Sequence, residues 1–186
     1  MIGKAVFASL DLGRHDVLKD EYQIKTDSTQ PICSKPQDII LITLMDLWLD
    51  NRDRKVTNSN LLLNFSDDFM YVFDHYDCFG GTRQIGNINV KSMIQSNGMF
   101  IESNLGQYFL KLTSKSQFDI IVDKFILDTA NNALLLQVLK QIQSIIPKQW
   151  LLSSNLFDQL ELFLLHNERK EIVIEHVKQR FRRYCI

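Results

Sequence analysis

The chain has 186 residues, of which 45% are hydrophobic and 23% charged, a composition typical of globular domains and not of disordered chains. Its 21 Lys and Arg residues nearly balance its 22 Asp and Glu residues, so the net charge of −1 provides no general electrostatic attraction to nucleic acid or to an anionic membrane. No apolar run approaches the ~18 residues of a membrane-spanning helix, and the opening MIGKAVFASLDLG does not have the pattern of a secretory signal.

The N-terminal part of the chain shows no clear hydrophobic period, and residues 1–36 are predicted to be a linker-like segment. Within it, residues 1–12 are expected to form either a short strand or an extended linker, and residues 26–36 a polar loop. The pattern changes at Gln37, and no internal repeat follows. Residues 37–186 are therefore predicted to fold as a single domain.

A helix is predicted from Gln37 to about Asp50. Pro36 and Asp38 suit its first turn. The helix should end near Asp50 because the next segment, NRDRKVTNSN (51–60), is polar throughout and offers no apolar face. The apolar residues at helical spacing in this stretch are Ile40, Leu44, Leu47 and Trp48.

Two short apolar runs follow the polar segment, LLLNF (61–65) and FMYVFD (69–74). The Ser66-Asp67-Asp68 turn between them gives the spacing of a β-hairpin. A glycine-containing loop is predicted over 75–89, and a stretch of mixed pattern continues from there to Leu112.

From Ser114 the sequence is helical almost to its end, with one break at Pro147, and three or four packed helices are predicted. The fold class expected from the whole pattern is α+β and predominantly helical. The residues predicted to face the core are Phe118, Ile121, Val122 and Phe125; Leu135, Val138, Leu139 and Ile145; Leu156, Leu160, Phe163 and Leu164; and Ile172, Val173, Val177 and Phe181.

Three smaller features have ordinary structural explanations. The three cysteines are far apart and not in Cys-x-x-Cys spacing, which favours reduced thiols in a cytoplasmic protein over a disulfide framework or a zinc site. His166 and His176 have no carboxylate or cysteine at metal-ligand spacing, so solvated or capping roles are expected. The basic segment KQRFRRYC (178–185) is predicted to be a solvated helix end, with binding of RNA or a protein partner as the alternative.

The polar segment and the hairpin together carry a pattern suited to phosphoryl transfer. Asp53 is followed five residues later by Asn58, and the second strand of the hairpin ends in Asp74. An aspartate on a rigid loop can orient an acceptor hydroxyl and take its proton, while an amide oxygen and a second carboxylate hold Mg²⁺ against nucleotide phosphates. This is the layout of the catalytic loop of protein kinases.

Two segments make the pattern specific enough to suggest a family. NRDRKVTNSNLLL (51–63) and FDHYDCF (73–79) resemble the HipA-like kinases, whose catalytic segment reads roughly Asn-x-Asp-Arg-x-x-x-Asn-x-Asn-Leu-Leu and is followed by Ile/Phe-Asp-His. IPKQWL (146–151) also resembles an Ile-Pro-x-x-Trp segment that precedes the final helices of that family. The resemblance runs from about Ala5 to the late 170s and is strongest over 51–75.

The resemblance implies a role for each matching residue. Asp53 would be the catalytic base and Asp74 the main Mg²⁺ carboxylate. The amide ligand of the metal would be Asn58, which keeps the five-residue spacing, or Asn60, which directly precedes the strand as the metal-binding asparagine of protein kinases does. Arg54 is expected to orient the loop, and His75 to be structural beside the metal site.

Taken together, the resemblance implies the C-terminal lobe of a protein-kinase-like fold, with a small β-hairpin carrying the metal-site Asp. The implied activity is an ATP- and Mg²⁺-dependent phosphotransferase acting on a Ser/Thr hydroxyl of a protein substrate in the cytoplasm, akin to the toxin-like kinases of bacterial toxin–antitoxin systems.

One part of the kinase pattern is not found. Before Gln37 there is no Gly-x-Gly-x-x-Gly and no equivalent of the strand lysine of Val-Ala-Ile-Lys, so the N-terminal lobe is expected to be absent from this chain. It would then be a fragment, one half of a split kinase completed by a protein partner, or a degenerate relative. The alternative function is therefore a non-catalytic module that keeps the kinase scaffold to bind protein.

Overall fold

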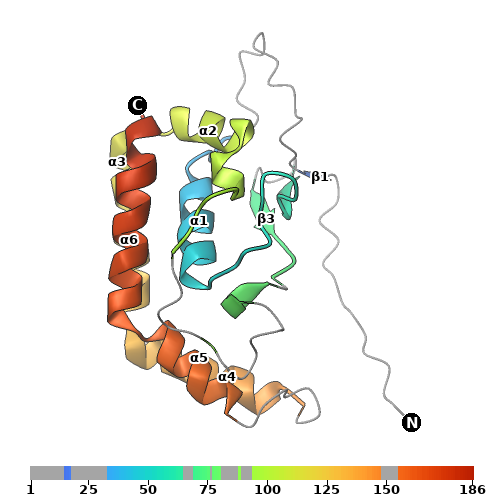
Figure 1. Cartoon of the computed structure of the whole chain (residues 1–186), viewed down its shortest axis with the longest axis vertical. Helices are drawn as coiled ribbons and strands as arrows, with labels where there is room; N and C mark the ends of the chain where they lie inside the picture. The colour runs from blue at the N-terminus through green and yellow to red at the C-terminus, as the bar shows by residue number, and fades with distance from the viewer. Residues whose placement is uncertain are drawn as a thin grey trace, which may run out of the picture.

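Helices make up most of the structure, and a small antiparallel sheet lies beside them (Figure 1). The structure is a computed structural model that describes residues 15–17, 33–64, 69–75, 77–80, 88, 94–147 and 155–186. This arrangement confirms the predicted α+β, mainly helical class. The helices are α1 (Asp38–Trp48), α2 (Asn104–Lys111), α3 (Lys115–Ala130), α4 (Asn132–Ile145), α5 (Leu156–Leu164) and α6 (Asn167–Phe181), the short 3-10 helices are η1 (Cys78–Gly80), η3 (Phe100–Glu102) and η5 (Arg182–Tyr184), and the strands are β1 (His15–Val17), β2 (Leu61–Asn64) and β3 (Met70–Val72).

Helix α1 forms the centre of the core, where it contacts α2, α3 and α6. Ile40 and Leu44 are fully buried on it, as their helical spacing predicts. At its C-terminal end the ring of Trp48 meets the ring of Phe125 edge to face, with 5.8 Å between the ring centroids. The end of α1 is thereby fixed against α3, and the polar segment 51–60 starts from a rigid point.

Helices α3 and α6 run antiparallel to each other (Figure 1). Near the end of α3, the carbonyl oxygen of Thr129 accepts a hydrogen bond from Lys170 Nζ at 2.6 Å, close to the start of α6. Near the start of α3, the Asp119 carboxylate pairs with Arg182 at 2.7 Å, just after α6 ends. These two contacts, one at each end, fix the alignment of the pair.

Helix α2 was not predicted, because it is short and lies in a stretch of mixed pattern. Its N-cap is Ser103, whose hydroxyl accepts from the Gly106 amide at 3.0 Å. A Cβ at Gly106 would collide with the carbonyl oxygens of Phe100 and Ile101, so the close approach of η3 to this helix requires glycine.

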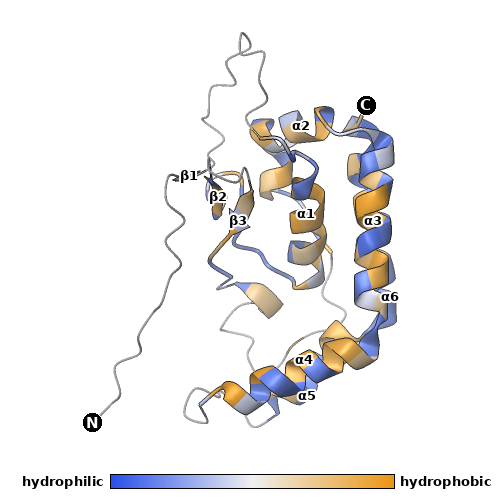
Figure 2. Ribbon diagram, turned by 180° about the vertical axis from the view of Figure 1, so that it is seen from behind, coloured by the Kyte–Doolittle hydropathy of each residue, from blue (hydrophilic) through white to orange (hydrophobic). Residues whose placement is uncertain are grey.

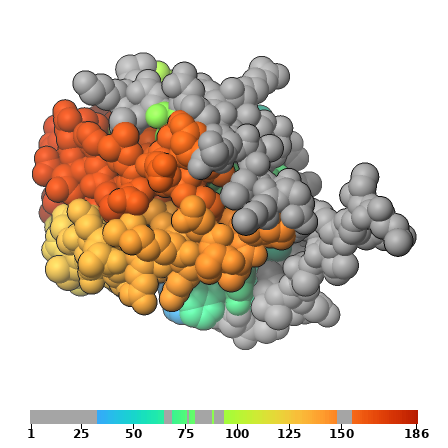
Figure 3. Space-filling view, turned by 90° about the horizontal axis from the view of Figure 1, so that it is seen from below, coloured from blue at the N-terminus to red at the C-terminus, as the bar shows by residue number. Residues whose placement is uncertain are grey.

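The predicted core faces are confirmed for α3, and for most of α6, where Val173, Val177 and Phe181 are buried. Helix α4 differs, because Val138 is 41% exposed and Ile145 is 77% exposed, so the prediction that they face the core was wrong. The same holds for Ile172 on α6. In the view from below, α4 and α5 form an outer surface of the molecule (Figure 3). Figure 2 shows that apolar residues occur along both helices. Periodicity identifies an apolar face but not what covers it.

The sheet is antiparallel with the strand order β1-β2-β3. In its register, Leu61 lies opposite Val72, and His15 lies opposite Asn64. The hairpin of β2 and β3 was predicted. Strand β1 was not predicted, because the only N-terminal strand considered was placed within residues 1–12, before His15. Residues 1–12 and the turn at 66–68 lie outside the described residues.

The smaller expectations fare differently. All three cysteines are free thiols, and the His166 side chain caps α6 by accepting from the Arg169 amide at 3.3 Å. The basic C-terminal segment is more than a solvated helix end, because Arg180 pairs with Glu102 at 2.5 Å, in addition to the pair of Arg182 with Asp119. Within the described part of the chain, no helix is both long and apolar enough to cross a membrane.

Candidate functional site

Loop 51–60 leaves the end of α1 and is held by backbone hydrogen bonds on both of its sides. Lys55 and Asn58 bond each other's backbone, with N to O distances of 2.8 and 3.1 Å, which closes a tight turn. On the other side, the amide of Val56 donates to the Gly98 carbonyl at 2.9 Å, and the amide of Phe100 donates to the Arg54 carbonyl at 3.2 Å. The loop is therefore anchored to the segment that precedes α2.

Three of the predicted site residues meet within this loop. The Asp53 carboxylate accepts a hydrogen bond from Asn60 Nδ2 at 2.7 Å and a longer one from Asn58 Nδ2 at 3.4 Å. The backbone amide of Asp53 donates to Asn51 Oδ1 at 3.2 Å, so the residue is held at its backbone and at its carboxylate. The sequence spacing alone did not indicate that both asparagines would reach this carboxylate.

The fourth predicted residue, Asp74, follows the second strand of the hairpin. The Phe73 amide donates to the Asn60 carbonyl at 3.2 Å, so the antiparallel pairing brings the end of β3 to the point where the loop enters β2. Asp74 is exposed and has a φ of 51°. The hairpin thus places Asp74 one residue beyond the backbone contact with Asn60.

Asn58 and Asn60 differ in exposure and in backbone conformation. Asn58 is exposed, whereas Asn60 is only 4% exposed and has a φ of 49°. Asparagine tolerates this left-handed conformation better than most residues. Asn60 is therefore built into the loop as a support of the Asp53 carboxylate, and the Asn58 side chain is accessible to a ligand.

Arg54 holds the loop from inside, the role that the resemblance implies for it. Its side chain is 2% exposed and pairs through Nε with the Asp46 carboxylate at 2.7 Å. Its Nη1 donates to the carbonyl oxygens of Ser59 at 3.0 Å and Asn60 at 2.5 Å. Burial raises the pKa of the Asp46 carboxyl above its ordinary value, and the Arg54 charge opposes that rise.

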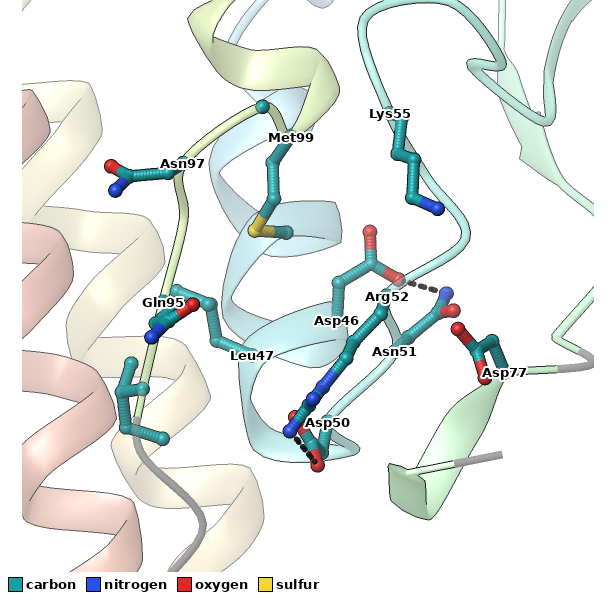
Figure 4. A pocket seen from close by; sticks show the side chains of 12 residues that line it. Asp46, Leu47, Asp50, Asn51, Arg52, Lys55, Asp77, Gln95, Asn97 and Met99 are labelled. Carbon is teal, nitrogen blue, oxygen red and sulfur yellow. Dashed lines mark hydrogen bonds and ion pairs between the residues drawn. The ribbon is translucent and has the colours of Figure 1, made fainter. Parts of the chain in front are cut away.

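A cavity of about 320 Å³ lies on one side of the loop, between it and the segment 94–99 (Figure 4). Asp50 and Arg52, which form an ion pair at 3.0 Å, lie on its wall with Lys55 and Asp77. Figure 4 shows these charged side chains gathered around the cavity with Asn51. The predicted site residues are not among the residues that line it: Asp53, Asn58, Asn60 and Asp74.

Two further side chains lie near the site, the thiol of Cys78 and the imidazole of His75. Burial, with a contribution from the charge of Asp46, raises the pKa of the Cys78 thiol to about 12, so the thiol is protonated at neutral pH. His75 is exposed and close enough to Asp46 to lower the pKa of the Asp46 carboxyl, against the larger effect of burial. Its expected structural role beside a metal site stays a prediction.

The donor set limits the kind of metal that the loop could hold. Within the described ranges, no three His, Cys, Asp or Glu side chains lie close enough together to bind a metal ion. An exposed amide at Asn58 and an exposed carboxylate at Asp74 offer few protein oxygens. Oxygen donors of this kind are those that Mg²⁺ takes, since it commonly keeps water and substrate phosphates as its remaining ligands.

Comparison with known proteins adds no relative: no family model, no curated protein and no solved structure matches this chain.

Sequence reasoning missed two residues that shape the site. Asp46 was not considered, although a carboxylate on the apolar side of a helix, next to Leu47, is a signal of a buried polar contact. Lys55 was also missed, because neither the loop pattern nor its charge indicated the cavity that it borders.

Proposed function

We propose that this chain is a phosphotransferase lobe that transfers a phosphoryl group from ATP to a Ser or Thr hydroxyl of a protein, as the resemblance to HipA-like kinases implies. The single observation that carries the proposal is the Asp53 carboxylate, held by the amide of Asn60 at 2.7 Å on an anchored loop. A solvated loop aspartate has no need of a buried asparagine in a left-handed conformation to fix it. The free thiols favour a cytoplasmic setting.

Bound Mg²⁺ and ATP would supply the transferable phosphoryl group and the positive charge that neutralises it. On this chain, Asn58 and Asp74 are the residues that fit as ligands, since both are exposed and both lie near the entry to the hairpin. This assigns the amide ligand to Asn58 and leaves Asn60 to hold Asp53.

Asp53 would orient the acceptor hydroxyl and accept its proton. A carboxylate that already accepts from Asn58 and Asn60 has a fixed direction, so its position costs no reorganisation when the acceptor arrives. The polar cavity beside the loop, with Lys55 and Asp77 on its wall, is not lined by Asp53, so it is not assigned to the acceptor hydroxyl.

A second candidate function is a module that binds protein without catalysis, alone or as half of a split kinase. The observation that favours it is the exposure of three apolar side chains in and beside β3, those of Phe69, Val72 and Phe73. A partner that supplies a nucleotide-covering lobe would cover these side chains, so the split-kinase form of this candidate is compatible with the leading proposal.

The test is a comparison of nucleotide binding with phosphate transfer. Mg²⁺ with ATP is expected to raise the melting temperature of the protein, and Asp74→Ala to abolish that rise. Asp53→Ala is expected to keep the rise and to lose transfer of labelled phosphate to protein acceptors. The matched control is Asp128→Ala, which removes an exposed carboxylate on α3 far from the loop in sequence.

If Mg²⁺ with ATP produces no rise in the melting temperature, with or without a partner that supplies an N-terminal lobe, the phosphotransferase proposal is wrong. The protein-binding module is then the better account. Equal loss of nucleotide binding and of phosphate transfer in Asp53→Ala would refute only the role given to Asp53 and not the phosphotransferase proposal.

A further inference from the structure

Asp46 is a buried carboxylate for which the proposed reaction has no direct use. It is 3% exposed on α1, and its two oxygens accept from Arg54 Nε at 2.7 Å and from Asn51 Nδ2 at 2.8 Å. Burying a carboxylate is unfavourable unless such charge-assisted hydrogen bonds compensate for the lost water. A helix that needed only to pack against its neighbours would be served better by an apolar residue here.

One path from Asp46 leads to Asp53. The amide nitrogen of Asn51 is fixed by one oxygen of Asp46, which leaves the amide oxygen of the same side chain to accept from the backbone amide of Asp53 at 3.2 Å. Because an amide group is planar, fixing its nitrogen also fixes its oxygen. The backbone of Asp53 is thereby held to α1 through Asn51, whose backbone amide also donates to the Asp46 carbonyl oxygen at 2.7 Å.

The other path leads to Asn60. The second oxygen of Asp46 fixes Arg54, whose Nη1 donates to the backbone carbonyls of Ser59 and Asn60 at 3.0 and 2.5 Å. The guanidinium is a rigid plane, so this pair sets where the Asn60 backbone lies. Asn60 then donates to Asp53 at 2.7 Å, and the two paths from one carboxylate close into a ring.

We infer that Asp46 is a positioning residue that sets the distance between Asp53 and Asn60 through Asn51 and Arg54. The inference rests on the proposed function for its effect on phosphate transfer, but its structural part concerns the Asn60 to Asp53 hydrogen bond alone. The arrangement explains why a charged residue occupies the buried side of the last turn of α1.

The variant that tests the inference is Asn51→Ala, because it cuts the path to Asp53 without leaving a buried charge unpaired. The matched control is Lys170→Met, which removes a buried group that bonds the Thr129 carbonyl at 2.6 Å at the junction of α3 and α4. Asp46→Asn serves as the second variant where it folds.

The first readout needs no activity. In Asn51→Ala the side-chain amide protons of Asn60 are expected to exchange with water at least about tenfold faster than in the wild type, and in Lys170→Met at the wild-type rate. Unchanged exchange in Asn51→Ala would overturn the inference, whatever the protein catalyses.

The second readout is a split between kcat and the KM for ATP. Asn51→Ala is expected to lower kcat by about 10- to 100-fold, with the KM for ATP and the melting-temperature rise with Mg²⁺ and ATP within about twofold of wild type. Lys170→Met is expected to keep kcat. An equal loss of kcat in both variants would show that lost stability explains it, and would overturn the positioning role.

The two proposals fail in distinguishable ways. A wild-type protein that neither binds nucleotide nor transfers phosphate, yet shows faster Asn60 exchange in Asn51→Ala, would refute the phosphotransferase and leave the positioning ring intact. Normal transfer with unchanged Asn60 exchange in Asn51→Ala would do the reverse.

Discussion

Arg54 and Arg169 are both buried beside the end of α1, but different partners balance their charges. Arg54 pairs with the Asp46 carboxylate at 2.7 Å and bonds the carbonyls of the loop. Arg169 donates to the last carbonyls of α1, those of Leu47 at 2.9 Å and Trp48 at 3.0 Å. Its guanidinium also lies over a phenylalanine ring, with 4.2 Å to the ring centroid. Burial lowers the pKa of Arg169 below its ordinary value.

The difference shows what each region needs. A helix end presents carbonyls and the negative end of its dipole whatever its sequence, and Arg169 donates to these carbonyls, with the charge of Asp50 also acting on it. A loop of irregular shape has no such field, and the chain provides the Asp46 carboxylate for Arg54. Arg169 therefore secures the packing of α6 on α1, whereas Asp46 and Arg54 secure the shape of the loop that carries Asp53.

The largest expected effect comes from breaking the ion pair. Asp46→Ala should lower the free energy of unfolding by about 3–5 kcal/mol, because it leaves the buried Arg54 charge without its carboxylate. Urea unfolding followed by circular dichroism measures the loss. The double variant Asp46→Leu with Arg54→Met is expected to regain most of the stability, since apolar residues often replace a buried pair without cost, but not the slow exchange of the Asn60 side chain. A double variant as unstable as Asp46→Ala would contradict this separation of stability from loop shape.

Arg169→Leu should have a smaller effect of about 1.5–3 kcal/mol, the range for hydrogen bonds made by a charged group, because the apolar part of the side chain is kept. The same urea titration measures it. The comparison predicts that Asn60 exchange stays at the wild-type rate in this variant. Faster exchange would show that the helix contact and the loop network are not independent.

Much of the fold was predictable from spacing along the chain. The core face of α3 and most of that of α6 follow from apolar residues that recur at helical intervals, and the start of α1 follows from the change of pattern at Gln37. Helix α2 was missed because it is short and because Gly106, its third residue, disfavours a helix locally; that glycine is required by a contact with η3, which sequence does not show. On α4, Val138 and Ile145 fit the pattern of a core face and are nevertheless exposed.

The candidate site divides in the same way. The spacing of Asp53, Asn58 and Asn60 was enough to place them on one loop, and a tight turn at Lys55 and Asn58 brings the asparagines back to the carboxylate. The support from Asp46 was not predicted, because the hydrogen bonds that join it to Arg54 depend on how the chain turns after α1 ends. No local pattern encodes that direction.

The smallest expected effect is a pH dependence that links the two regions. His176 lies on α6, the helix of Arg169, and its Nε2 is 3.0 Å from the hydroxyl of buried Ser96, in the segment that borders the loop. Burial lowers the pKa of His176 below its ordinary value, and the nearby charge of Arg180 lowers it further, while Glu102 opposes the shift.

The sign of the effect follows from which state binds the proton first. As the pH falls below about 6.5, the unfolded chain takes up a proton on this histidine before the folded protein does, so stability decreases until the pH reaches the lower folded pKa. The melting temperature of the wild type should therefore fall between about pH 7.5 and pH 5.5 by more than that of His176→Gln. An identical fall in both proteins would show that protonation of His176 does not change the stability of the fold. A larger fall in His176→Gln would reverse the direction argued for this pKa.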